Sequence, residues 1–124
     1  MSASVARLVW PALFFVGIFG SGFWLTRAGR PYNGVLLTFH KLIALAAVVF
    51  LAVTIYRLGR TAGLGAGQLT AVIAAGLCFV ALIVTGGLLS ALKVPPPAIR
   101  TAHHILPYLA LLCTAAGLAL GGRG

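Results

Sequence analysis

Three histidines are the side chains of this sequence that are best suited to bind a metal ion. His40 and His103 each lie within a long apolar segment, two residues after a threonine and directly before a basic or imidazole side chain, Lys41 or His104. An ionisable residue inside a membrane span indicates a functional site, because burying it in hydrocarbon is costly. We therefore expect His40 and His103 to be a pair of axial ligands to one metal ion.

His104 is the alternative ligand. Its side chain lies about 100° around the helix from that of His103, so these two neighbours cannot bind the same iron atom. A copper site made from all three histidines stays open as a second metal hypothesis. Cys78 and Cys113 are expected in the middle or far half of their spans, away from the histidines, as small buried hydrophobic residues that imply no disulfide framework.

The composition restricts the chemistry that these histidines can join. The chain has 124 residues with nine Lys+Arg, no Asp or Glu, 61% hydrophobic residues and a mean hydropathy of +1.12. Such a composition excludes a soluble globular domain, and the missing carboxylates exclude paired-carboxylate hydrolysis, Ser-His-Asp triads and carboxylate-driven proton antiport. The basic residues are scattered singly between apolar stretches, so they predict contacts with anionic phospholipids in a bilayer and no nucleic-acid partner.

Four apolar stretches are long enough to cross a bilayer, which needs about 20 residues of helix. The prediction is an all-α membrane protein, a single domain over residues 1–124 whose helices run up-down-up-down as a four-helix bundle, with spans at about 8–26, 35–58, 68–92 and 98–121. Asn33 is expected to cap the second span, and the prolines at 95–97 stop the third. A cleaved secretory signal is the competing interpretation of the first stretch.

An internal repeat relates the first two spans to the last two. Residues 38–44, with His40, resemble residues 101–107, with His103, and residues 21–26 resemble residues 85–90. Two spans separate equivalent positions, so both halves have the same orientation and are expected to be related by an axis along the membrane normal. The repeat predicts that His40 and His103 lie at the same depth, and chance similarity between apolar helices is the alternative.

Glycines on the odd spans share the depth of the histidines. Each histidine is expected about 9–10 Å below the interface at a rise of about 1.5 Å per residue. A flat macrocycle at this level would need axial nitrogens from two sides and missing side chains where its edge passes a backbone. We therefore expect haem b between the second and fourth spans, and the glycines of this layer are Gly20, Gly22, Gly86 and Gly87.

Basic residues are expected at the rim of the same layer. Haem carries two propionates that are costly to leave unpaired near hydrocarbon, and cations are their natural partners. The candidates are Arg27, Arg30, Lys93 and Arg100, with anchorage to lipid phosphate as the alternative for each. The Lys and Arg residues divide into four on one side of the membrane and five on the side of the histidines, and this difference is too small to determine the orientation of the chain. We favour a cytoplasmic location for the side with five.

The chain resembles the small membrane b-type cytochromes, which include the haem-bearing cores of quinol-oxidising complexes and the membrane anchors of succinate dehydrogenase. The resemblance covers the whole architecture and rests on His40, His103 and the four glycines. His40-Lys41 is similar to the His-basic pair of the anchors. The serine expected just upstream of that pair is replaced here by Thr38, at a different spacing from the histidine. It implies one bis-histidine haem and electron transfer, linked to quinol or quinone or within a redox complex. This chain has one histidine layer where the larger cytochromes have two.

Two functions without redox chemistry stay open. One is a small transporter or channel acting as a homodimer, and the other is a structural subunit of a larger membrane complex. The sequence does not decide whether the chain is an enzyme. The location we expect is the prokaryotic inner membrane, with several spans.

Overall fold

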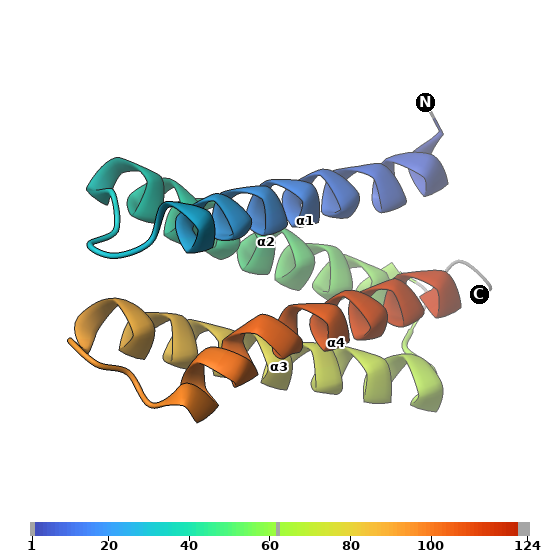
Figure 1. The fold of residues 1–124 in the computed structure, drawn as a ribbon. Helices are drawn as coiled ribbons and strands as arrows, with labels where there is room; N and C mark the ends of the chain where they lie inside the picture. Colours follow the sequence, from blue (N-terminus) through green and yellow to red (C-terminus); the bar gives the residue numbers. More distant parts are fainter. Residues whose placement is uncertain (1, 62, 122–124) are drawn as a thin grey trace. The chain divides into compact units, whose positions relative to one another are not determined.

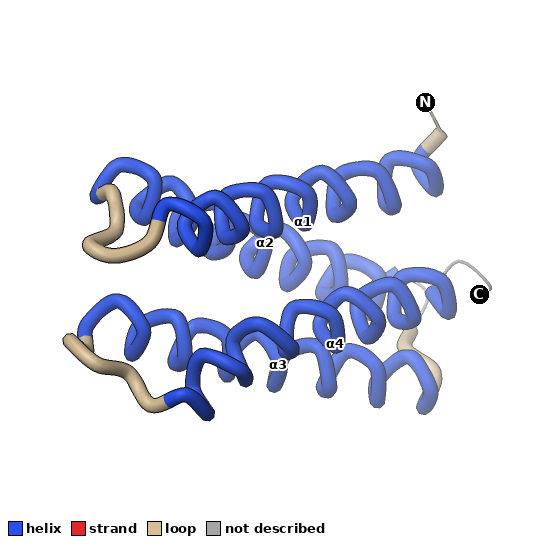
Figure 2. The backbone as a smooth tube through the Cα atoms, viewed as in Figure 1, coloured by secondary structure: helices blue, strands red, loops and turns tan. Residues whose placement is uncertain are grey.

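The computed structural model describes residues 2–61 and 63–121, and within them the chain is helical and has no strand (Figures 1 and 2). The prediction of an all-helical chain with four long apolar helices is confirmed. The helices are α1 (Ala3–Ala28), α2 (Gly34–Thr61), α3 (Ala66–Ala91) and α4 (Pro97–Gly121).

Polar caps and turn residues set the helix ends. The Ser2 hydroxyl accepts the backbone N–H of Val5 at the start of α1, and Gly29 ends this helix with a φ of +75°, which favours glycine. The Asn33 side chain accepts the first free N–H groups of α2 at 2.9 and 3.1 Å, as predicted. Pro97 begins α4, a position that suits proline because the first turn leaves its N–H groups unbonded in any case.

The chain divides into two helical hairpins: α1 with α2, called the first hairpin, and α3 with α4, called the second hairpin. The two helices of each hairpin are antiparallel (Figure 1). In the first hairpin, a Cβ added at Gly17 would collide with Ile43, so the missing side chain lets the two helices come close. In the second, a Cβ added at Gly117 would lie 3.6 Å from Val72 and 3.8 Å from Ala71, which is ordinary contact.

The buried residues of the two hairpins follow the sequence repeat. Phe15 and Leu25 of α1 correspond to Phe79 and Leu89 of α3 at a constant offset in residue number, and all four are buried. Ala47 of α2 corresponds in the same way to a buried alanine of α4. The two hairpins therefore use the same register to pack their helices.

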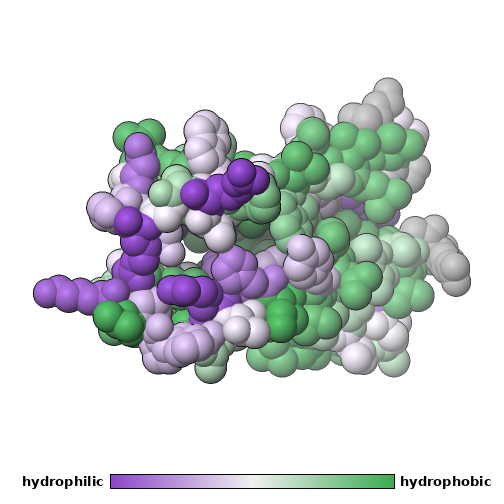
Figure 3. Space-filling view, viewed as in Figure 1, coloured by the Kyte–Doolittle hydropathy of each residue, from purple (hydrophilic) through white to green (hydrophobic). Residues whose placement is uncertain are grey.

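The outer surfaces of both hairpins are apolar, as lipid contact requires. All four helices are long and apolar enough to cross a membrane, and hydrophobic side chains within them such as Val16 and Leu77 are 69% and 67% exposed. In each hairpin the polar surface gathers around the loop that joins its helices, and the helix shafts are hydrophobic (Figure 3). The chain is a multi-pass membrane protein.

Candidate functional site

His40 is held against α1 by a serine hydroxyl. Its Nδ1 lies 2.8 Å from the Oγ atom of Ser21, which is 5% exposed. The same Oγ lies 2.7 Å from the backbone oxygen of Gly17, one turn earlier on α1. The imidazole of this half-buried histidine is therefore tied to a hydroxyl that is itself bonded to its own helix.

His103 makes the same contact in the second hairpin. Its Nδ1 lies 2.8 Å from the Oγ1 atom of Thr85, and this Oγ1 lies 2.8 Å from the backbone oxygen of Ala81. Thr85 takes the place that Ser21 has in the first hairpin, and Ala81 takes that of Gly17. The repeat therefore extends from the sequence to a specific contact between helices.

The hydroxyl contacts determine which imidazole nitrogen carries the proton. A hydroxyl oxygen 2.7 Å from a carbonyl oxygen needs a hydrogen between the two atoms, and Ser21 has only one to give. The 2.8 Å contact must then be an Nδ1–H of His40 donating to Ser21. In a neutral imidazole the lone pair is then on Nε2, and the same reasoning applies to His103 with Thr85.

Two of the predicted glycines make room for these rings. A Cβ at Gly22 would lie 3.1 Å from Cε1 of His40, and a Cβ at Gly86 would lie 3.0 Å from Cε1 of His103. Both distances are tighter than nine in ten real Cβ contacts, so a side chain here would require the ring to shift by a few tenths of an ångström. The two glycines thus position the imidazoles, a role that the sequence analysis did not foresee.

The other two glycines have open surroundings. A Cβ at Gly20 or Gly87 would meet no described atom within 4 Å. Their expected role beside the edge of a macrocycle stays a prediction. So does the pairing of His40 with His103, since each hairpin is described by itself.

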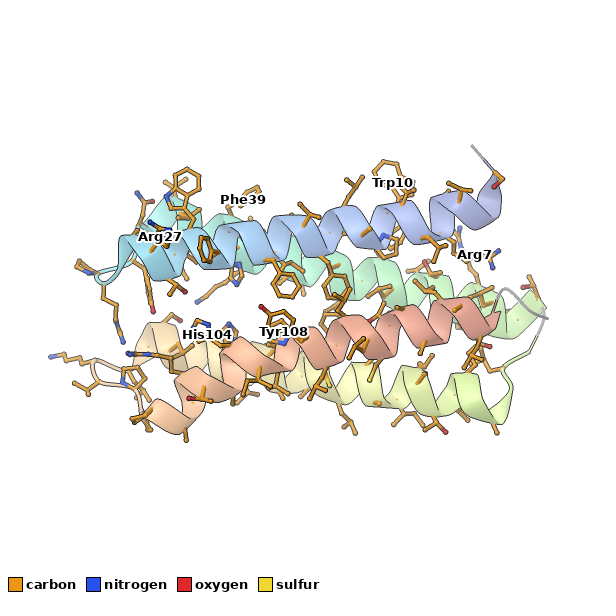
Figure 4. The ribbon with its side chains drawn as sticks, turned by 45° about the vertical axis from the view of Figure 1, so that its right-hand side comes forward. Arg7, Trp10, Arg27, Phe39, His104 and Tyr108 are labelled. Carbon is orange, nitrogen blue, oxygen red and sulfur yellow. The ribbon has the colours of Figure 1, made fainter. Side chains whose placement is uncertain are left out.

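His104 lies on another face of α4. Its side chain is exposed, and Arg100 and Tyr108, one turn away on either side along the same face, are exposed as well. Figure 4 shows His104 and Tyr108 on the same side of α4. His104 is therefore turned away from the contact that holds His103 to α3.

The predicted basic residues are exposed and lie near the loop end of each hairpin. Figure 4 shows Arg27 near the loop end of the first hairpin. Its guanidinium lies 5.6 Å from the ring centre of Phe23, and that of Arg30 lies 5.3 Å from the ring centre of Tyr32. Lys93 follows α3 and is exposed. Because the sequence has no Asp or Glu, these cations have no side-chain carboxylate to pair with.

Within the described parts of the chain, no three or more His, Cys, Asp or Glu side chains gather as a metal-binding group. Comparison with known protein families, curated protein sequences and solved structures finds no match. Each hairpin by itself has one half-buried imidazole with a hydroxyl partner and a glycine beside it.

Sequence analysis aligned Ser21 with Thr85 but gave neither a role. The signal was present, since each hydroxyl directly precedes a glycine of the predicted layer. What the sequence lacked was the rotation of α1 against α2, and of α3 against α4, which decides whether these hydroxyls face the histidines.

Proposed function

We propose that this chain is a membrane b-type cytochrome that binds one haem b through Nε2 of His40 and Nε2 of His103, one histidine from each hairpin. The observation that carries the proposal is the matched hydrogen bond of the two rings, at 2.8 Å in both hairpins. Histidines that bind metals almost always donate their other ring N–H to a fixed acceptor, which sets the tautomer and the ring orientation.

The residues present suit this cofactor. A porphyrin supplies four nitrogen ligands to its iron, so the protein needs to add only two, and each hairpin has one suitable imidazole. Gly22 and Gly86 leave each ring room to lie against its odd helix, where the hydroxyl fixes it. A zinc site, in contrast, takes three or four protein ligands.

The basic residues near the loops suit the two haem propionates. Arg27 and Arg30 belong to the first hairpin, Lys93 and Arg100 to the second, and all are exposed. Charge-assisted hydrogen bonds to carboxylates are about twice as strong as neutral ones, so even one such pair would favour bound haem. Lipid phosphate competes for the same cations.

The function that follows is electron transfer. Iron with two histidine ligands has no open coordination position, so the bound haem would supply one-electron chemistry and no substrate site. A lipid-soluble quinol or quinone, or the redox centre of a partner subunit, is the electron donor or acceptor that we propose.

The test is the colour of the purified chain. We expect protein made with haem supplied, or apoprotein titrated with haemin in detergent, to show a Soret band and a sharp α-band on reduction, with one haem per chain. His40→Ala and His103→Ala should each lose the bis-histidine spectrum, whereas His104→Ala, the matched exposed histidine, should keep it.

A colourless chain that takes up no haemin overturns the proposal. A bis-histidine spectrum that survives both His40→Ala and His103→Ala overturns the ligand assignment. Solute flux through vesicles that contain the colourless chain would favour the transporter, and co-purifying subunits without flux would favour the structural role.

A further inference from the structure

The two cysteines of the second hairpin lie side by side. Cys78 of α3 and Cys113 of α4 lie close enough for their thiols to interact. Both are free thiols and half-buried. The sequence alone predicted two small buried hydrophobic residues away from the histidines, and the structure adds that the two lie close together across the helix pair.

The repeat supports this contact independently. The positions that correspond to Cys78 and Cys113 in the first hairpin are Phe14 and Phe50. The rings of these two phenylalanines are in contact, with their centres 5.4 Å apart. This level is therefore a point of direct side-chain contact between the helices of both hairpins, occupied by an aromatic pair in one and by two thiols in the other.

The helices of the second hairpin come close at this level. Ala75 lies one turn before Cys78 on α3, and Ala110 lies one turn before Cys113 on α4; they are 9% and 0% exposed. Small residues at a helix interface let the backbones approach, and a disulfide needs Cα atoms separated by only about 4.4–6.8 Å. The buried alanines therefore favour a close approach of α3 and α4 beside the two cysteines, which a disulfide would require.

We propose that Cys78 and Cys113 form a reversible dithiol–disulfide pair that joins α3 to α4 and is oxidised by a lipid-soluble acceptor of the quinone class. Two S–H bonds break and one S–S bond forms, and the two electrons and two protons reduce the two quinone carbonyl oxygens to hydroxyls. The products, a disulfide and a quinol, are both uncharged and can therefore exist in hydrocarbon at little cost. A metal ion held by two thiolates would instead bury charge there. The inference does not depend on the haem proposal.

The location of the thiols determines which oxidant can reach them. Both cysteines lie within helices that span the membrane. Cys113 is ten residues past His103, which corresponds to about 15 Å along α4. A hydrophobic quinone dissolves at this depth, whereas a charged, water-soluble disulfide such as oxidised glutathione does not. The pair should therefore respond to the first oxidant and resist the second.

The experiment uses the full chain in lipid vesicles, reduced and then treated with a fully substituted alkyl benzoquinone, which cannot alkylate thiols. After quenching with a maleimide, cleavage at Lys93 and Arg100 separates the two cysteines unless a disulfide joins their fragments. We expect linked fragments by mass spectrometry, free fragments after reduction with dithiothreitol, and little linkage with oxidised glutathione.

A shifted pair provides the control for geometry. In Cys113→Ser with Leu112→Cys, the second thiol moves to a residue that is 66% exposed and about 100° around α4. We expect the native pair to link at least roughly tenfold faster, because disulfide geometry is specific. Equal rates in the two proteins, or native thiols that stay alkylated after quinone treatment, would overturn the proposal.

A transfer of the pair to the first hairpin tests the register. Phe14→Cys with Phe50→Cys, in a chain that also carries Cys78→Ser and Cys113→Ser, should link under the same conditions. Failure to link there, with the native pair also failing, would show that these positions do not face each other closely enough for a disulfide. Linkage only between separate chains would likewise overturn the proposed intramolecular bond.

Discussion

Replacing Ser21 by alanine tests the central hydrogen bond of the site. The substitution removes the acceptor of the His40 Nδ1–H and leaves the imidazole and its helix in place. Loss of a partner for a buried polar group costs about 1–3 kcal/mol, and loss of the outer-shell partner of a metal ligand lowers metal affinity about 10–100-fold. The two ranges agree, since about 1.4 kcal/mol corresponds to a factor of ten.

The surroundings of His40 place the effect at the lower end of this range. His40 is half-buried, and the penalty for losing a hydrogen-bond partner is largest for a fully buried group. We therefore expect Ser21→Ala to weaken haem binding about tenfold. The midpoint potential should rise, because a histidine without this acceptor is a poorer electron donor to ferric iron.

The assay is haemin titration of the apoprotein, followed by a redox titration of the bound haem. Ser21→Thr keeps a hydroxyl at this position, as Thr85 does in the second hairpin, and should keep wild-type affinity. Thr54→Ala is the matched control, because Thr54 bonds to the Phe50 carbonyl at 2.8 Å but serves no histidine. Unchanged affinity and potential in Ser21→Ala, or equal losses in Thr54→Ala, would refute the reasoning.

Three further substitutions test the packing and charge around the site. Gly22→Ala should lower haem affinity and leave the protein about 1–3 kcal/mol less stable than Gly20→Ala, because both variants gain the same helix propensity but only the first overpacks against an imidazole. Thermal unfolding in detergent compares the two variants, and equal melting temperatures would contradict the contact. Gln68→Leu should lower the free energy of unfolding by about 1 kcal/mol, because the buried Gln68 side chain donates a hydrogen bond to the Gly117 carbonyl at 3.1 Å. Steric trapping or thermal unfolding would measure this loss, and an unchanged stability would show that the bond is dispensable. If the Arg27 guanidinium binds a propionate, Arg27→Gln should lower haem affinity more at low salt than at high salt. Haemin titration at two ionic strengths measures this difference. An affinity equal to that of the wild type at both ionic strengths would show that Arg27 faces only lipid.

Much of the fold could be predicted from the sequence because its signals are local. Four apolar stretches of sufficient length predict four helices, and Asn33 and Pro97 mark helix starts through their own chemistry. The histidines could be singled out for the same reason, since an ionisable residue in an apolar stretch needs no knowledge of its neighbours.

The contacts between helices could not be predicted in this way. A rotation of one residue moves a side chain about 100° around its helix, and the spacing within one helix does not fix its rotation against another. This is why no role was predicted for Ser21 and Thr85, and why no contact between Cys78 and Cys113 was predicted. The repeat predicts that Cys78 and Cys113 face each other only when the contact between Phe14 and Phe50, at the corresponding positions, is known from the structure.

The matching contacts weaken the alternative that the repeat is a chance similarity of apolar helices. Chance can align leucines and alanines, but it does not place a hydroxyl, a glycine and an imidazole in the same arrangement twice, with the same 2.8 Å contact in each hairpin.

The repeat fails at other positions, and the failures are informative. Lys41 corresponds to His104, and the equivalents of Arg27 and Arg100 are an alanine and a leucine. The ring-holding contacts are thus duplicated while the cations are not. A ligand that binds both histidines alike would need such duplication at its centre but not at its periphery. Four candidate cations for two propionates leave at least two that pair with lipid phosphate if each propionate takes one, so neutralising the four singly should change the haem potential unequally.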